Sequence, residues 1–440
     1  MIGNDHATKD NKMSDVDLSA LNGDFKQAYQ DKIKDLVPNY AYILKNTTVE
    51  KGMKQLGDKF NAPVKVQSGQ GYTYNTDGSA FALNAAIGLQ MENALVPAFS
   101  LIRRDNISYT AISRSAGKNS FGKAVDITLN DMTEGAGFRL EATYLHGTRG
   151  IGVTSSTTAV SSTQTTVQLT AASWATGIWA SSIGAQVQFY VVSSGALVSS
   201  GADSVFQVVG MDFTAFTLTV NGTTTGSTAL VAATATPLNV AFNGAFGATF
   251  ALPVEGVGLI TIASNKGTLF SINSVTWPLW QGNIYDAGAA PLSFGKLQKA
   301  ITLPGDKGLM GEECTVLVPL TSFSDLLTEQ AAARRYGDVK GKKMDNGADA
   351  LEFYSPSGTM TIVPHPLMKR GEALLYPTDS ITRIGSSELT FQLPGTSTDS
   401  YLQVPLGDFA GYQVRIWADN TVFAETPSHM CLITNIVPRS

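Results

Sequence analysis

Residues 120–147 read SFGKAVDITLNDMTEGAGFRLEATYLHG, and this stretch decides the fold. Its apolar residues recur at spacings of three or four, the period of one helical face, at Phe121, Val125, Leu129, Met132, Ala136, Leu140 and Tyr144. Ser120 can cap the start of a helix and Gly147 can end it. At 1.5 Å per residue this helix is roughly 40 Å long, which exceeds most helices of globular proteins. The sequence therefore predicts one long central helix.

The residues before this helix have the pattern of an extended ribbon. Val64, Val66, Tyr72 and Tyr74 alternate with polar residues, and a turn-forming Asn-Thr-Asp-Gly sequence follows at 75–78. A second β-prone run, residues 95–112, is expected to return alongside the first. Together they predict a projecting two-stranded arm over 61–115. Such a ribbon is barely stable alone, so we expect support from outside the arm.

The first 60 residues predict a polar start and then a helix. Ser14 and Asp17 have the spacing of a capping box, which satisfies free N–H groups at a helix start. Leu18, Leu21 and Phe25 then fall near one helical face. Pro38 ends the helix, because the residue before a proline avoids helical geometry.

Residues 152–270 read as a separate all-β unit, a small sandwich or barrel. Short β-prone runs are separated by Ser, Thr, Gly and Asn turns, at 165–170, 185–192, 204–211, 213–220 and 238–242. The window 151–250 holds only two charged side chains, Asp203 and Asp212. Since small domains normally have a mixed-charge surface, this one is expected to be shielded by neighbours or hydrated through Ser and Thr.

Mixed α and β signals return beyond residue 265, so the fold class is α+β. Helices are expected at 292–300 and from Ser322 to Tyr336. Strands are expected at 315–318, 359–363, 374–376, 389–393, 414–417 and 430–437.

Bulk composition excludes several classes of protein. The net charge of −5 and the pI near 5.5 argue against sequence-specific nucleic-acid binding, which usually needs a basic face. Cys314 and Cys431 form no disulfide framework and are expected to be free thiols. The first residues show no secretory signal, and no apolar run reaches the length of a membrane span.

The sequence contains no recognisable catalytic or metal-binding constellation. His6, His146, His365 and His429 are dispersed, and no G-x-S-x-G motif accompanies them. His146 is expected at the end of the long helix, where a cation suits the dipole. The acidic stretch at 345–349 lacks the ligand pattern of a calcium loop and is interpreted as a polar turn. No phosphate-binding loop is present, so we expect no enzyme, no cofactor and no metal.

The order of these elements, together with several short segments, resembles the major capsid proteins of tailed bacteriophages, podovirus-like ones in particular. The resemblance rests on FNAPV at 60–64, GYTY at 71–74, RLEA at 139–142, WP at 277–278 and GYQVR at 411–415. It covers most of the chain except 152–270, which looks like an insertion domain.

The resemblance implies six regions and a function. The regions are an N-terminal arm (1–60), an extended loop (61–115), a spine helix of the peripheral domain (116–151), a β insertion domain (152–270), an axial domain with the return to the peripheral domain (271–410), and C-terminal peripheral strands (411–440). A capsid protein of this kind self-assembles through hexamers and pentamers into an icosahedral head. The head encloses double-stranded DNA without sequence-specific binding.

The same resemblance implies partners and a location. Scaffolding, portal and decoration proteins are the expected partners besides the chain itself, and no membrane is involved. Assembly of a procapsid in the host bacterial cytoplasm and its maturation to a virion capsid are expected.

Six residues of the predicted arm are candidates for contact with a neighbouring subunit: Tyr72, Tyr74, Phe81, Phe99, Arg103 and Arg104. The aromatic rings would be buried when the arm docks. The two arginines have two interpretations. They are solvated side chains on an exposed ribbon, or they form an ion pair between subunits that fixes where the arm binds.

One alternative function remains open. The Ser/Thr-rich β segment is also typical of a β-rich phage tail or adhesin protein. That class predicts strand patterns throughout, whereas the flanks of this segment have helical patterns.

Overall fold

The structure, a computed structural model, describes residues 41–50, 55–56, 59–76, 78, 80–97, 99–110, 121–247, 249, 256–334, 351–355, 358–391, 403–405 and 410–439. The helix expected before Pro38 and the polar turn at 345–349 lie outside the described residues. Contacts divide the chain into two compact units. Unit 1 comprises Met1–Leu36, Leu101–Gly137 and Glu388–Ala418, and unit 2 comprises Val37–Ser100, Phe138–Ser387 and Asp419–Ser440.

The expected long helix is present as α4 (Phe121–His146). Its residues up to Gly137 belong to unit 1 and the rest to unit 2. The helix ends where Gly147 takes a positive φ of 44° and a short 3-10 turn, η1 (Gly147–Arg149), begins. A Cβ on Gly147 would lie 2.1 Å from the backbone nitrogen of Gly258, so glycine is required here for two reasons.

In unit 1 a strand layer packs on the first part of α4. β5 (Ser100–Ser108) pairs with β21 (Gly411–Ala424), which also pairs with β20 (Gln403–Pro405). The buried core of this unit is formed by Met132 and Ala136 of α4 against Val414 and Ile416 of β21. The predicted strand at 414–417 is thus confirmed and is longer than expected.

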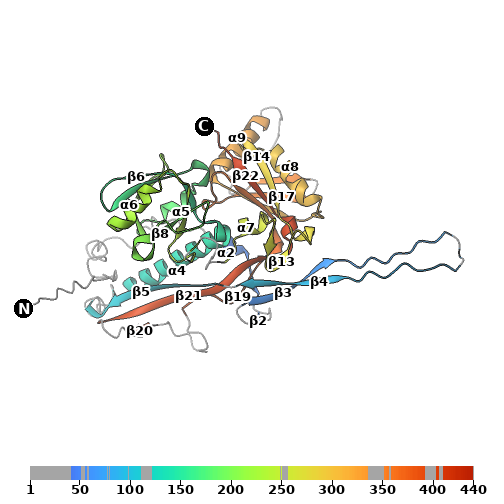
Figure 1. Cartoon of the computed structure of the whole chain (residues 1–440), viewed down its shortest axis with the longest axis horizontal. Coiled ribbons are helices and arrows are strands. Elements are labelled where there is room, and N and C mark those ends of the chain that lie inside the picture. Colours follow the sequence, from blue (N-terminus) through green and yellow to red (C-terminus); the bar gives the residue numbers. More distant parts are fainter. Residues whose placement is uncertain are drawn as a thin grey trace, which may run out of the picture. The chain divides into compact units, whose positions relative to one another are not determined.

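The arm has a different return strand from the one expected. β3 (Lys59–Gln67) pairs antiparallel with β4 (Gln90–Pro97), and a short β2 (Gln55–Leu56) joins at its other edge. The prediction that residues 95–112 form one returning run is wrong, because that run is divided between β4 and β5. β propensity identifies strand residues but does not choose their partner. In Figure 1 the chain between β3 and β4 continues as two extended segments beyond the paired strands.

Six strands of unit 2 close into a barrel in the order β10-β7-β6-β11-β8-β9. They are β6 (Gly152–Ala159), β7 (Gln164–Leu169), β8 (Gln186–Val191), β9 (Phe206–Asp212), β10 (Thr217–Asn221) and β11 (Leu238–Phe242). The interior is filled by fully buried side chains such as Val167, Leu218 and Val240. Closure leaves no free sheet edge, which protects the unit from unwanted strand pairing.

The barrel begins and ends at neighbouring strands. β6 and β11 are paired with Gly152 opposite Val240, so the chain enters and leaves at one place. Helices α5 (Thr176–Ala180) and α6 (Thr224–Ala232), which the sequence patterns did not indicate, lie in its connections.

The last barrel strand ends at Phe242, and Thr249 still forms an isolated bridge with Ala196. The boundary expected at residue 270 stays a prediction. The next described helix, α7 (Leu259–Ala263), contacts η1 instead, and Thr148 Oγ1 lies 2.9 Å from Thr261 Oγ1. A two-stranded pair, β12 (Thr268–Leu269) and β13 (Ile272–Asn273), follows.

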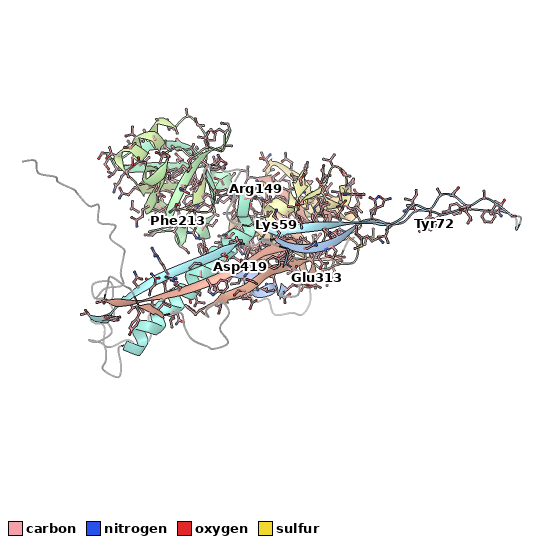
Figure 2. The ribbon with its side chains drawn as sticks, turned by 60° about the horizontal axis from the view of Figure 1, so that its bottom comes forward. Lys59, Tyr72, Arg149, Phe213, Glu313 and Asp419 are labelled. Carbon is pink, nitrogen blue, oxygen red and sulfur yellow. The ribbon has the colours of Figure 1, made fainter. Side chains whose placement is uncertain are left out.

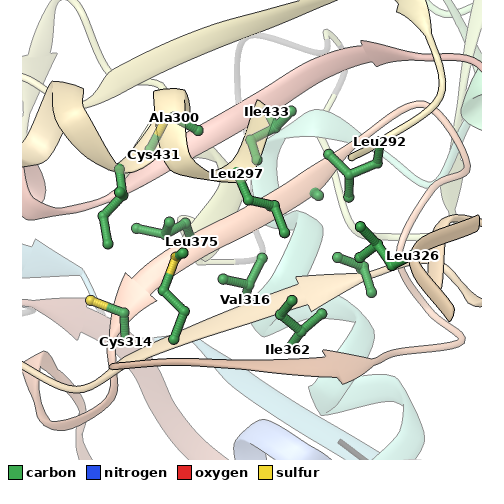
Figure 3. Close-up of a cluster of buried hydrophobic side chains, with 14 of the residues drawn as sticks. Leu292, Leu297, Ala300, Cys314, Val316, Leu326, Ile362, Leu375, Cys431 and Ile433 are labelled. Atoms are coloured by element: carbon green, nitrogen blue, oxygen red, sulfur yellow. The ribbon is translucent and has the colours of Figure 1, made fainter. Parts of the chain in front are cut away.

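The main core of unit 2 is a six-stranded sheet with the order β14-β22-β18-β15-β17-β16. The strands are β14 (Asn283–Ala290), β22 (Cys431–Ile436), β18 (Ala373–Pro377), β15 (Cys314–Val318), β17 (Gly358–Pro364) and β16 (Leu351–Ser355). Helices α8 (Phe294–Gly305) and α9 (Leu320–Arg334) complete this region. Figure 3 shows Leu297 and Ala300 of α8 beside Val316 and Ile433 of the sheet. The helices predicted at 292–300 and 322–336 and the strands at 315–318, 359–363, 374–376 and 430–437 are confirmed within the described residues, with shifted ends. The strand expected at 389–393 overlaps only the end of β19 (Ile381–Thr390).

Unit 2 also contains a short helix and strand near the start of the described chain. Helix α2 (Tyr42–Asn46) leads into β1 (Val49–Glu50), which pairs in parallel with β19 (Ile381–Thr390). Val49 lies opposite Arg383 in this pairing. Residues more than 300 positions apart in the sequence are therefore joined here.

Candidate assembly surface

The arm beyond Gln67 carries large apolar side chains in solvent. Between β3 and β4 the described residues make one isolated bridge, in which Gln70 and Ile87 exchange two backbone hydrogen bonds of 2.9 Å. Seven large hydrophobic residues on this stretch and the start of β4 are exposed: Tyr72, Tyr74, Phe81, Leu83, Ile87, Leu89 and Met91. So many exposed large apolar side chains on one short stretch are typical of an interaction site.

The arm contains little that would bury these side chains within the chain. Tyr74 is 92% exposed and Leu83 is 78% exposed. The two extended segments are joined through Asn84, whose backbone N–H donates to Thr73 Oγ1 and whose side chain donates to Tyr72 O, both at 2.9 Å. Figure 2 labels Tyr72 on this extended part. Among the described residues the arm is thus two segments wide, with its rings uncovered.

Phe99, a predicted contact residue, lies inside the chain. It is only 8% exposed and packs edge-on against Tyr144 with 6.5 Å between ring centroids. A Cβ on Gly256 would lie 2.9 Å from its ring, so the backbone closes over it. Phe99 is therefore unsuited to contact a neighbouring subunit, and this part of the prediction is corrected.

Arg103 and Arg104 lie on β5 and not on the arm. The Arg103 guanidinium forms an ion pair with Asp131 of α4, and its Nη1 also donates to Asp131 O at 2.7 Å. Neither of the two interpretations of Arg103 included this partner in the same chain, and a contact of Arg103 with another subunit stays a prediction. Arg104 is exposed.

A buried carboxylate that the sequence patterns did not single out holds helix α2. Glu141 is fully buried, and its two oxygens accept hydrogen bonds from the backbone N–H groups of Ile43 (2.7 Å) and Leu44 (2.9 Å). His365 Nε2 lies 3.0 Å from the same carboxylate. A negative charge at a helix start compensates the free N–H groups there.

The other end of α2 is held by a cation. Arg383 is 4% exposed, and its guanidinium donates to Leu44 O at 3.2 Å and Thr47 O at 2.8 Å. Glu141 and Arg383 thus bind opposite ends of one five-residue helix with charges that match its dipole. A charged residue beside the apolar stripe of α4 is the signal that could have identified Glu141.

His146 lies in a buried, structural environment. His146 Nε2 lies 2.7 Å from Leu367 O, and burial lowers the pKa of this histidine well below its ordinary 6.5. The expectation of a cation at the end of α4 is therefore wrong, since burial dominates over the dipole.

No catalytic or metal site emerges from the part of the chain that the structure describes. No group of three or more His, Cys, Asp or Glu side chains in it could hold a metal ion. Cys314 and Cys431 are free, and burial raises the pKa of both thiols to about 12. Among the described helices, none is long and apolar enough to cross a membrane.

Comparison with known proteins identifies the fold. No protein-family model and no curated protein matches the sequence. The chain is similar to a solved chain of the cyanophage A-1(L) capsid asymmetric unit, with a TM-score of 0.50 and 11% identity, over 93% of this chain and 96% of that one.

Two further solved capsids align along the chain at lower TM-scores. One is the capsid of cyanophage P-SCSP1u, with a TM-score of 0.45 and 8% identity over 93% of this chain and 92% of that one. The other is the capsid of the native GTA particle, with a TM-score of 0.45 and 8% identity over 93% and 94%. The similarity to the A-1(L) chain confirms the predicted fold class, the α+β fold of tailed-phage major capsid proteins, with α4 as its long helix.

Proposed function

We propose that this chain is the major capsid protein of a tailed bacteriophage. It is a non-enzymatic subunit that self-assembles into an icosahedral head enclosing double-stranded DNA. The observation that carries the proposal is the phage-capsid fold over 93% of the chain. The uncovered apolar arm supports it, because a subunit that works alone gains nothing from such a surface.

In this proposal the arm orders and buries its side chains on a neighbouring copy. Burying apolar area contributes about 25 cal/mol per Å², so part of each ring contributes on the order of 1 kcal/mol. Tyr72, Tyr74 and Phe81 are exposed and available for such contacts. Repeated at every subunit of a closed shell, these modest contributions determine whether the shell forms.

Finer parts of the proposal concern the subtype, the barrel and the partners. The podovirus-like subtype rests on the sequence resemblance at 60–64 and 71–74. The barrel Gly152–Phe242 is proposed as a domain inserted after the spine helix, since it begins and ends at paired strands. Hexamers and pentamers of the chain, with scaffolding, portal and decoration proteins, complete the proposed assembly.

The alternative of a β-rich tail or adhesin protein is disfavoured. Such a protein is expected to be built from strands throughout. Here α4, α8 and α9 flank the barrel in sequence, and the solved capsid chain aligns along 93% of the chain.

Shortening the arm tests the proposal. Residues 71–86 are replaced by Asn-Gly, a turn that suits a two-residue hairpin and keeps the Gln70–Ile87 bridge. β3 and β4 remain intact, so the shortened chain is expected to melt cooperatively like the full chain. Shells, tubes or capsomers should be lost or strongly reduced in electron microscopy and sedimentation.

Two point variants separate apolar contact from arm length. Tyr72→Ser with Tyr74→Ser should weaken assembly, whereas Val160→Ser on the barrel, which also removes an exposed apolar side chain, should leave it unchanged. A full chain that stays monomeric at high concentration would contradict the proposed function. Normal shells from the shortened chain would contradict the role of the arm alone.

A further inference from the structure

Residues 365–372 lie between the barrel and the end of α4. Three backbone hydrogen bonds of 2.8 to 3.0 Å join this segment to the barrel, from Gly177 N to Pro366 O, from Arg370 N to Trp174 O and from Gly371 N to Ala172 O. The contact is tight, because a Cβ on Gly177 would lie 2.9 Å from Pro366 Cβ, and one on Gly371 would lie 2.8 Å from Ala172 Cβ.

The same segment is held from the other side by polar groups at and beyond the end of α4. His146 Nε2 contacts Leu367 O at 2.7 Å. Lys369 Nζ donates to Gly150 O at 3.0 Å, and Arg149 forms an ion pair with Glu372 at 2.9 Å. Residues 365–372 therefore link the barrel to the end of α4, in addition to the direct contact of Arg139 with Phe242.

The protonation state of His146 follows from its partners. A carbonyl oxygen only accepts, so Nε2 must carry the hydrogen in its contact with Leu367 O. The other nitrogen, Nδ1, is buried and has no hydrogen-bond partner among the described residues. His146 is 1% exposed, so solvent does not reach Nδ1. In this position the His146 ring is neutral, and the lone pair of Nδ1 accepts no hydrogen bond from the described residues.

Protonation of Nδ1 would add a cation to a site that already holds several. Lys369 and Arg149 both disfavour charge on His146, and so does His365, which faces Glu141. Both carboxylates named at the junction have other partners, since Glu372 pairs with Arg149 and Glu141 contacts His365 and the α2 amides. A protonated Nδ1 would be buried among like charges without an acceptor, which is strongly unfavourable.

We infer that residues 365–372 form an acid-sensitive latch between the barrel and α4, with His146 as the group whose protonation releases it. Opening exposes the ring to water, where its ordinary affinity for a proton returns. Opening of the latch is therefore coupled to the uptake of one proton by His146.

The sign of the pH dependence follows from burial. In the latched state burial, and then the Lys369 charge, hold the pKa of His146 well below 6.5, whereas the opened ring has its ordinary pKa. The latch is fully stable above pH 6.5 and weakens as the pH falls from 6.5 toward the latched pKa, by about tenfold per pH unit. From pH 7.5 to 5.5 the opening equilibrium should rise about tenfold.

Hydrogen exchange of the full chain at matched intrinsic rates tests this inference. The amides of Gly177, Arg370 and Gly371 donate across the junction, so they report its opening. They should lose about tenfold in protection between pH 7.5 and 5.5. In His146→Gln, whose amide can still donate to Leu367 O and does not titrate, the loss should be under about twofold.

The matched control is His429→Gln, a histidine outside the junction, which should retain the tenfold response. An unchanged protection in the original chain, or a full response in His146→Gln, would overturn the latch. If His146→Gln does not fold, nuclear magnetic resonance titration of the four labelled histidines decides the question. A His146 ring that titrates at or above 6.5 in the folded chain also rules it out.

Discussion

The guanidinium of Arg103 occupies the space beside Gly135 in which another residue would place its Cβ. A Cβ built on Gly135 would lie 2.1 Å from Arg103 Nη1. The same nitrogen donates to Asp131 O one turn earlier, and the guanidinium pairs with the Asp131 carboxylate. The glycine, which weakens an isolated helix, therefore permits a clamp between β5 and α4 within unit 1.

This relationship predicts that Gly135→Ala changes the free energy of unfolding differently with and without Arg103. Alanine is favoured over glycine inside a helix by about 1 kcal/mol. With Arg103 present, the new methyl displaces the guanidinium, and loss of a partly exposed ion pair offsets most of that gain. In Arg103→Ala the space is empty, so Gly135→Ala should stabilise the chain by about 1 kcal/mol. Urea unfolding of the four variants measures this coupling, and strictly additive effects would refute it.

Glu141→Gln should destabilise unit 2 by about 2 kcal/mol or more, because one of the two α2 amides loses its acceptor in a buried site. The carboxylate accepts from Ile43 N and Leu44 N, and a glutamine side chain offers only one oxygen. Urea unfolding gives the free energy of unfolding. Glu92→Gln, an exposed carboxylate on β4, is the matched control and should change stability by less than about 0.5 kcal/mol.

Periodic patterns predicted much of the fold. Residues 121–144 carry an uninterrupted helical spacing, and α4 extends over Phe121–His146. The β-prone runs at 165–170 and 238–242 correspond to β7 and β11 within one residue. These elements are local, so spacing and turn residues are sufficient to indicate them.

Pairing and burial could not be predicted in this way. Residues 95–108 are β-prone throughout, and nothing local shows that β4 pairs with β3 whereas β5 pairs with β21. For that reason the sequence alone predicts Arg103 on the arm and Phe99 in a subunit contact. The partner Ile43 of Glu141 lies 98 positions away and the partner Thr47 of Arg383 lies 336 positions away, and no spacing in one sequence indicates such pairs.

Lys369 should make the stability of the chain increase in alkali. Burial lowers the pKa of its ammonium to about 8 from an ordinary 10.5. The folded lysine loses its proton before the unfolded one, so stability rises as the pH increases from 8 through 10.5, and is lost again as the pH falls toward 8. The gain is about 3 kcal/mol over this window.

Lys369→Met removes the buried ammonium and its titration. The stability of the original chain relative to Lys369→Met should therefore rise between pH 8 and 10.5. Effects of the buried tyrosines are common to both proteins and cancel. Exposed Lys299→Met serves as the control and should show a flat difference. A flat difference for Lys369→Met as well would mean that the ammonium is not desolvated.

Removal of the barrel should leave the rest of unit 2 folded. Gly152 lies opposite Val240 across the β6–β11 pair, so a four-residue Gly/Ser linker can replace residues 153–241. This deletion retains Phe242, whose ring lies 3.2 Å from the Arg139 guanidinium carbon.

The buried core around Val316 and Ile433 contains no barrel residue and should be unaffected. Four backbone groups that are bonded to the barrel, Ile151 N, Pro366 O, Arg370 N and Gly371 N, would become exposed to water, which can satisfy them. We therefore expect the shortened chain to melt cooperatively, with a free energy of unfolding lower by about 1 to 3 kcal/mol. Circular dichroism and calorimetry measure this melting. A remainder that melts without cooperativity would mean that the barrel is part of the folding unit around α4.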